Sequence, residues 1–229
     1  MMETIEKPAL EVVFPEYPKI ETLYNRNPEN MKKVIAGDLR KQEFGLVDRW
    51  LVTEKVDGTN IRVLLGWNEG DPFIRFGGRT SAAQMSTSLL DYLSTTFTLD
   101  RVAAAFDEGT TAVLFGEGYG PKIQKGGGLY RVDISFRLFD VSVIGDRTWW
   151  LNWNDVTDIA GKLDIQHVPV LGDDVTTDEA IGLVSLPSMT ARADGGSGCA
   201  QEGVVARTDP GLLMRDGKRM VWKLKERDF

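Results

Sequence analysis

The chain has 229 residues, 42% of them hydrophobic, and a formal net charge of −7, so it is long enough to form one large domain or two small ones around a real core. Its single cysteine, Cys199, excludes an intrachain disulfide, which suits a reducing cytoplasm. No stretch approaches the ~20 apolar residues that span a membrane, and the N-terminus lacks the basic start and apolar core of a signal peptide. We therefore expect a soluble cytoplasmic protein.

The N-terminal residues, up to about residue 30, carry three prolines in PEYPKIETLYNRNP and predict an extended segment. We expect residues 1–49 to form an arm packed on a core domain at 50–229. Strands are predicted where β-branched and aromatic residues cluster between turn residues, and helices where apolar residues share one helical face. In chain order we expect strands at 50–54, 60–65 and 73–76, helices at 86–97 and 99–106, strands at 112–115, 136–144 and 148–151, helices at 154–163 and 177–184, and strands at 203–207 and 220–225.

The predicted strands cluster and do not alternate regularly with helices. This pattern disfavours a doubly wound parallel sheet and favours an α+β domain of antiparallel sheets flanked by helices. The glycine-rich stretches at 116–120 and 126–128 match neither the Walker nor the Rossmann phosphate-binding pattern. A nucleotide, if one is bound, must be held in another way.

Residues 53–60, TEKVDGTN, place a lysine at the end of an apolar strand and directly before an Asp-Gly pair. Taken alone, this stretch is typical of a β-hairpin, because Asp57 and Gly58 both favour a positive φ. A functional interpretation needs support from the rest of the chain.

The charge is unevenly distributed. Residues 146–202 contain ten acidic and three basic residues, whereas residues 207–227 contain seven basic and three acidic ones. The basic C-terminal segment would give a polyanion a favourable local surface on an acidic protein. A solvated surface of uneven charge explains the same pattern equally well.

Six short motifs follow one another along the chain: EKVDGTN (54–60), GGRT (77–80), LFGEGYG (114–120), FRLFDV (136–141), EGVVAR (202–207) and WKLK (222–225). In this order they resemble the covalent nucleotidyltransferase superfamily of polynucleotide ligases and mRNA capping enzymes. The match is closest to the ATP-dependent RNA ligases that seal nicks in duplex RNA. The resemblance covers residues 50 to 227 and implies a nucleotide pocket between antiparallel sheets. Ligases of this superfamily typically carry an accessory domain beside this core, but because the sequence stops at Phe229 we expect none after it.

The resemblance implies that a lysine attacks the α-phosphorus of ATP, holds AMP, and passes it to a 5′-phosphate end that a 3′-OH then attacks. Lys55 is the implied nucleophile. Because an ammonium cannot attack, we expect nearby cations, Lys223 among them, and partial desolvation to favour the neutral amine. Lys223 and Lys225 alternate on one strand face, so both can point at the phosphate and neutralise charge as pyrophosphate leaves.

The remaining roles are also implied by the resemblance. Glu202 is expected to organise Mg²⁺ or Mn²⁺ through water, with Asp57 sharing that role or acting in sealing. Some RNA ligases are expected to carry histidine at the position of Asp57, so this residue does not distinguish RNA from DNA as substrate. The implied nucleotide contacts are Glu117 to the ribose, Phe139 stacked on adenine, Asn60 and Arg79 to ribose or phosphate, and Glu54 to the adenine amino edge.

RNA, most simply a nicked duplex, is the implied partner. Lys122 and Lys125, in the glycine-rich loop 119–130, are candidate backbone contacts, although a mobile surface loop is equally consistent with this sequence. Without an accessory domain we expect weak duplex binding, unless a partner protein or second copy supplies a clamp. Further candidate phosphate contacts lie in the N-terminal arm at Arg26, Lys32, Lys33, Arg40 and Lys41. His167 lacks the partners of a zinc site.

Two other interpretations stay open. Within the same chemistry, the chain would be a DNA ligase or a GTP-using capping-type enzyme. In another class, it would be a nucleotide-binding or RNA-binding module that does not react.

Overall fold

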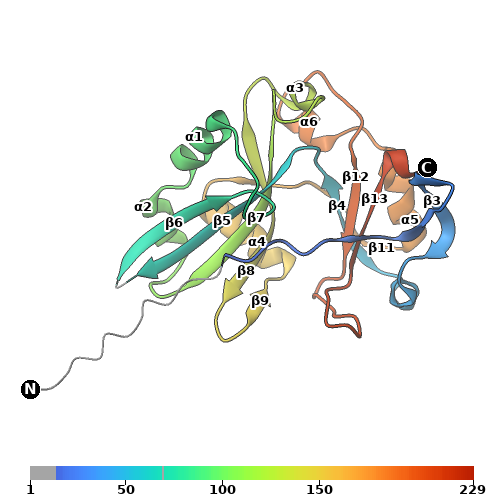
Figure 1. Ribbon diagram of the computed structural model, residues 1–229, viewed down its shortest axis with the longest axis horizontal. Coiled ribbons are helices and arrows are strands. Elements are labelled where there is room, and N and C mark those ends of the chain that lie inside the picture. The colour runs from blue at the N-terminus through green and yellow to red at the C-terminus, as the bar shows by residue number, and fades with distance from the viewer. Residues whose placement is uncertain (1–13, 69) are drawn as a thin grey trace, which may run out of the picture.

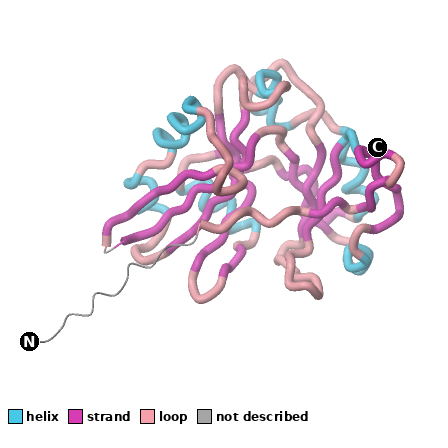
Figure 2. Tube along the Cα trace, in the orientation of Figure 1, coloured by secondary structure: helices cyan, strands magenta, loops and turns pink. Residues whose placement is uncertain are grey.

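The computed structural model describes residues 14–68 and 70–229, in which two sheets lie side by side (Figure 1). Residues of both sheets line one cavity. Figure 2 shows the strands in the middle of the molecule and most helices around them. Within this described part of the chain, no helix is long and apolar enough to cross a membrane.

The five-stranded sheet joins segments from both ends of the chain. Its strand pairs are antiparallel except for β1, which pairs parallel with β13. Trp222 and Leu224 of β13 are fully buried, while the residues between and beside them face away from this core. The order is β1 (Glu21–Thr22), β13 (Val221–Lys225), β12 (Gly203–Arg207), β4 (Trp50–Lys55) and β11 (Val170–Val175).

The six-stranded sheet is built from a continuous stretch of the chain. Its core packs under α1 (Thr87–Thr96), α2 (Leu99–Ala105) and α4 (Trp153–Lys162). The order is β10 (Gln166–His167), β8 (Ser135–Ile144), β7 (Thr111–Tyr119), β5 (Thr59–Asn68) and β6 (Asp71–Gly77), and β9 (Thr148–Trp150) pairs with β8.

The remaining elements lie outside the two sheets. The strands β2 (Tyr24–Asn27) and β3 (Asn30–Leu39) form a separate antiparallel pair. Three helices, α3 (Gly127–Tyr130), α5 (Thr177–Gly182) and α6 (Met189–Ala193), and 3₁₀-helices at Gln42–Leu46, Leu183–Ser185 and Glu226–Asp228 complete the described elements.

The α+β architecture of antiparallel sheets flanked by helices is confirmed, and every predicted strand and helix overlaps an observed one. The sequence did not predict β1, β2, β3, β10, β11, α3 or α6. Of the predicted arm, residues 1–13 lie outside the described residues. Within its remainder, β1 joins the five-stranded sheet and β2 pairs with β3.

The β-hairpin that the local pattern at Asp57-Gly58 suggested does not form. The strand before this turn, β4, and the strand after it, β5, belong to different sheets. Neither residue has a positive φ. Gly58 is required for another reason, because a Cβ on it would lie 2.2 Å from the carbonyl oxygen of Gly118. The turn therefore carries the chain from one sheet to the other, and its close approach to β7 allows no side chain.

Candidate functional site

A cavity of about 470 Å³ lies where the two sheets meet. It brings together residues that are far apart in the sequence. The sequence-predicted residues among its lining are Glu54, Lys55, Asp57, Asn60, Arg79, Glu117, Phe139, Glu202, Lys223 and Lys225. Such convergence of charged and aromatic groups in one pocket is typical of a ligand site.

Lys55 ends β4 and is held by the strand pairing of the five-stranded sheet. Gly203 of β12 stands in register with Lys55 on one side and with Lys225 of β13 on the other. The carboxylate of Glu202, one residue before that glycine, accepts a hydrogen bond from Lys55 on Oε2 and from Lys225 on Oε1. One carboxylate thus fixes two ammonium groups at the cavity wall.

The electrostatics of Lys55 differ from the expectation. Burial lowers the pKa of Lys55, but the nearby carboxylates, Glu117 first and then Glu202, outweigh it and raise the pKa above its ordinary value. The expected bias toward the neutral amine is therefore wrong for this cavity, in which Lys55 is an ammonium. Lys223 behaves in the opposite way, because burial and the charges of Lys55 and Lys225 lower its pKa to about 8.

Glu117 and Asn60 face each other across neighbouring strands, since β7 and β5 place them in register. Burial raises the pKa of Glu117 to about 7, against the lowering effect of Lys55. Oδ1 of Asn60 is buried and accepts no hydrogen bond within the described residues. Buried polar atoms are normally satisfied, so this oxygen is available to a donor on a ligand.

Phe139 reaches the cavity because of a β-bulge. In the pairing of β7 with β8, Phe115 is opposite Asp140 and Gly116 is opposite Leu138, so Phe139 has no partner on β7. Bulges next to functional sites re-aim a side chain in this way. The ring of Phe139 is half-buried and lines the cavity.

A metal ion in this cavity would need water molecules among its ligands. In residues 14–68 and 70–229, no group of three or more histidine, cysteine or acidic residues is arranged to hold an ion. Both oxygens of Glu202 accept from lysines, and burial with the charge of Glu202 raises the pKa of Asp57. This donor set fits Mg²⁺ or Mn²⁺ with water and phosphate oxygens completing the coordination, because Mg²⁺ keeps several waters.

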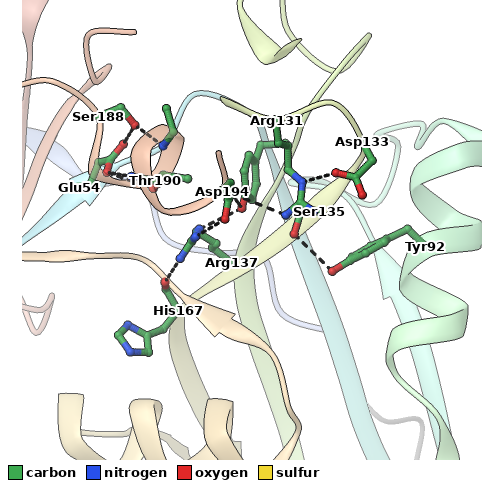
Figure 3. Close-up of polar contacts among 12 residues, drawn as sticks. Glu54, Tyr92, Arg131, Asp133, Ser135, Arg137, His167, Ser188, Thr190 and Asp194 are labelled. Carbon is green, nitrogen blue, oxygen red and sulfur yellow. Dashed lines mark hydrogen bonds and ion pairs between the residues drawn. The ribbon is translucent and has the colours of Figure 1, made fainter. Parts of the chain in front are cut away.

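Glu54 has a different part from the one predicted. Its buried carboxylate accepts hydrogen bonds from the Ser188 hydroxyl at 2.6 Å and from the Thr190 N–H and hydroxyl at 2.8 and 3.0 Å (Figure 3). Glu54 therefore anchors the start of α6, and its oxygens are not free to reach an adenine. Beyond the other end of α6, Asp194 accepts from Arg137 of β8 at 2.7 Å (Figure 3). This short helix is tied to both sheets.

Arg79 lines the cavity from the loop after β6. That loop is fixed by the buried Arg62, whose Nε donates to the Gly78 carbonyl at 2.6 Å. In the glycine-rich loop, Gln124 lines the cavity and donates to the Gly58 carbonyl at 3.0 Å. Lys122 instead lines an adjoining pocket of about 150 Å³, and Lys125 lines neither.

The basic residues predicted as phosphate contacts in the arm are largely paired within the chain. Arg40 lies 3.6 Å from Glu21, and Lys41 lies 3.4 Å from Asp216. Arg26 pairs with Asp228 at 2.6 Å, and Lys33 donates to the Phe229 carbonyl. None of these residues lines the cavity.

Further lining residues escaped the sequence analysis, among them Tyr17, Lys19, Gln124, Arg207 and Arg227. Arg207 belongs to the EGVVAR motif, which was a usable signal. Tyr17 had none beyond its proline-rich surroundings, because its place depends on where the N-terminal segment docks.

A sequence model of the RNA ligase family matches residues 48–225. The chain belongs to the RNA ligase family. Its fold is similar to that of Naegleria gruberi RNA ligase in three structures, one with PPi, one of a mutant with ATP and Mn, and one of another mutant with AMP and Mn. Each has 20% identity and a TM-score of 0.62, and the alignment covers 93% of this chain.

This RNA ligase family chain spans 56% of the length of those Naegleria chains. The family resemblance predicted from the six motifs is confirmed, and so is the fold class. A comparison with curated proteins found no match.

Proposed function

We propose that this chain is an ATP-dependent RNA ligase that forms a covalent lysyl-AMP on Lys55 and joins 3′-OH to 5′-phosphate ends. The observation that carries the proposal is the array in which Glu202, directly before β12, accepts hydrogen bonds from Lys55 of β4 and Lys225 of β13. Glu117 and Phe139 of the other sheet line the same cavity. These are the groups that the chemistry needs: a nucleophile, charge stabilisation, and contacts to a ribose and a base.

In the first step, the neutral amine of Lys55 attacks the α-phosphorus of ATP. An N–P bond forms, the bond from phosphorus to the bridging oxygen breaks, pyrophosphate leaves, and Lys55 gives up a proton to the surroundings. Because positioning contributes most to such a reaction, the hold of Glu202 on Lys55 is central. Lys223 and Lys225 stabilise the charge that develops on the leaving group.

The nucleotide contacts follow from the cavity walls. Phe139 stacks on the adenine, and Glu117 and Asn60 accept hydrogen bonds from ribose hydroxyls. Glu202 and Asp57 hold a divalent ion through water, and that ion, when bound, supplies positive charge that favours the neutral form of Lys55. The Naegleria ligase structures with ATP, AMP and Mn support ATP and a divalent ion as the ligands of this cavity.

The AMP then passes to the 5′-phosphate of an RNA end, and a 3′-OH displaces it to make the phosphodiester bond. We propose a nicked duplex as substrate, held in part by Lys122 and Lys125, with an accessory protein as a candidate clamp. The paired state of Arg40 and Lys41 reduces their value as phosphate contacts. Cytoplasmic RNA repair suits such a protein, since its single cysteine requires no oxidising compartment.

Intact mass spectrometry after incubation with each of the four NTPs and Mg²⁺ or Mn²⁺ tests the proposal. We expect a mass increase of one AMP with ATP, and release of pyrophosphate in equal amount. A dominant GMP adduct would instead indicate a capping-type enzyme. Tight ATP binding without any adduct would indicate a binding module. Sealing assays on nicked RNA and nicked DNA duplexes then identify the polynucleotide.

A further inference from the structure

The segment 14–22, here called the N-terminal strap, crosses from one sheet to the other beside the cavity (Figure 1, dark blue). At one end, Arg62 of β5 donates to the carbonyls of Phe14 and Pro15 at 2.9 and 3.0 Å. At the other end, β1 pairs with β13 and sets Thr22 in register with Lys223. Residues 17–20 between these two anchors line the cavity.

Tyr17, in the middle of the strap, makes two charge-assisted hydrogen bonds. Its hydroxyl donates to Oδ2 of Asp140 at 2.8 Å and accepts from Arg219 at 3.0 Å. Arg219 also donates to the same carboxylate oxygen at 2.7 Å and lies 3.6 Å from the ring centre of Trp150. Burial raises the pKa of Tyr17 to about 12, so its hydroxyl remains a donor at neutral pH.

The same network surrounds Phe139. The Tyr17 ring packs edge-on against the Phe139 ring, with centroids 5.1 Å apart and planes at 72°. Asp140 follows Phe139 directly in the bulge, and Arg207 donates to the Phe139 carbonyl at 2.9 Å. Ring and backbone of Phe139 are therefore held by side chains that come from the strap, from β12 and from the segment before β13. A bulged residue without a strand partner needs such support to keep one orientation.

We propose that Tyr17 is a positioning residue for the nucleobase: it fixes the ring of Phe139 through the Tyr17–Asp140–Arg219 network. This inference rests on the proposed function, in which the cavity holds ATP with its base on Phe139. A base stacks well only on a ring held in place, since part of the binding free energy is otherwise spent on ordering that ring. Tyr17 then acts on nucleotide affinity and not on the chemical step.

A double-mutant cycle tests this with Tyr17→Phe, which removes only the hydroxyl, and Phe139→Ala, which removes the ring. The ligand is an ATP analogue with a methylene group between the α- and β-phosphates, so that Lys55 cannot displace pyrophosphate. We expect Tyr17→Phe to weaken binding of the analogue about fivefold in calorimetry. This is less than the full effect of losing a hydrogen bond to a charged group, because only part of that loss reaches the Phe139 ring. In the Phe139→Ala background it should change binding less than about twofold, because coupled residues are not additive.

Two further variants separate positioning from mere stability. Asp140→Asn should reproduce the effect of Tyr17→Phe, while the rate of adduct formation at saturating ATP changes less than about twofold in either. The matched control is Thr177→Val, which removes a hydroxyl that accepts from Trp50 at 2.9 Å, on α5 and outside the cavity lining. It should leave analogue binding unchanged. Urea unfolding identifies any variant whose fold is lost.

Wild-type binding by Tyr17→Phe would overturn the inference, and so would an effect that persists in full without Phe139. If the wild type binds the analogue and the cycle shows coupling but ATP leaves no adduct, the proposed function fails and the inference stands. If the adduct forms but the cycle shows no coupling, the inference fails alone. If the wild type does not bind the analogue, both fail.

Discussion

Lys55 donates a hydrogen bond from its ammonium to the carboxylate of Glu202, so the candidate nucleophile is held in place by an acid. Lys55→Ala should abolish the AMP adduct in intact mass spectrometry. Calorimetry should show nearly unchanged binding of the methylene analogue, because the base and ribose contacts remain. Lys55→Arg is the matched control, since it keeps the positive charge but cannot become a nucleophile near neutral pH. If the Lys55→Ala variant still formed a covalent adenylate, Lys55 could not be the nucleophile.

The carboxylate of Glu202 is shared, because Lys225 donates to its second oxygen. Glu202→Ala leaves two half-buried ammonium groups without an acceptor and removes the proposed water-mediated metal contact. We expect the rate of adduct formation to fall about a hundredfold or more, measured with radiolabelled ATP. Excess chelator should stop the wild-type reaction as well. Full-rate labelling in chelator would contradict the metal role.

Lys223 gives nucleotide binding a pH dependence. Burial and the charges of Lys55 and Lys225 lower its pKa to about 8, so this ammonium is charged below that pH and neutral above it. Affinity for the methylene analogue should fall about tenfold between about pH 7.5 and about pH 9.5. Lys223→Arg should remove most of this fall, because arginine stays charged. If titration calorimetry showed the same fall of affinity with pH for the wild type and for Lys223→Arg, Lys223 would not be the group that causes it.

Glu117 links pH to stability. Burial raises its pKa from 4.5 to about 7, so the folded state binds a proton that the unfolded state has released between those values. Its stabilising contribution is complete below about pH 4.5 and is lost as pH rises through about 7. In urea unfolding, the free energy of unfolding of the wild type should fall by about 1–2 kcal/mol more than that of Glu117→Gln between about pH 5 and about pH 8. A Gln variant that loses as much as the wild type would disprove this.

Glu54 distinguishes an anchor from a base contact. Glu54→Ala leaves the donors of Ser188 and Thr190 without their acceptor, so the free energy of unfolding should fall by about 3 kcal/mol. Affinity for the methylene analogue should change less than about threefold below the unfolding temperature. Phe139→Ala should show the reverse, with weaker nucleotide binding and a smaller loss of stability. If Glu54→Ala instead bound the analogue more weakly and kept its free energy of unfolding, the result would support the predicted contact of Glu54 with adenine.

The sequence predicted best what depends on local pattern. Alternation along 220–225 correctly placed Lys223 and Lys225 on the face opposite Trp222 and Leu224. The motifs also brought together the residues that line the cavity, and most of them lie at strand ends or turns, whereas FRLFDV lies inside β8. The strand β11, whose sequence VLGDDV lacks apolar alternation, was missed.

Non-local relationships could not be predicted from the sequence. The Asp57-Gly58 turn has the local signal of a hairpin, yet β4 pairs with β11 and β12, more than one hundred residues later, and β5 pairs with β6 and β7. Glu54 finds its partners 134 and 136 residues later in the chain. The bulge at Phe139 is a shift in register between β7 and β8, so the sequence of neither strand alone predicts it. For the same reason, the raised pKa of Lys55 required the positions of its surrounding carboxylates.

The two sheets differ in how their strands are spread along the chain. All strands of the six-stranded sheet lie between residues 59 and 167, whereas the five-stranded sheet combines residues 21–22 and 50–55 with 170–175 and 203–225. During synthesis from the N-terminus, the wall that carries Glu117 and Phe139 can be complete while β12 and β13 are still untranslated. Lys55 is synthesised early, but Glu202 and Gly203 must follow before β4 can pair with β12 and the amine can find its acceptor. The Lys55–Glu202–Lys225 array is therefore completed later in synthesis than the wall that carries Glu117 and Phe139.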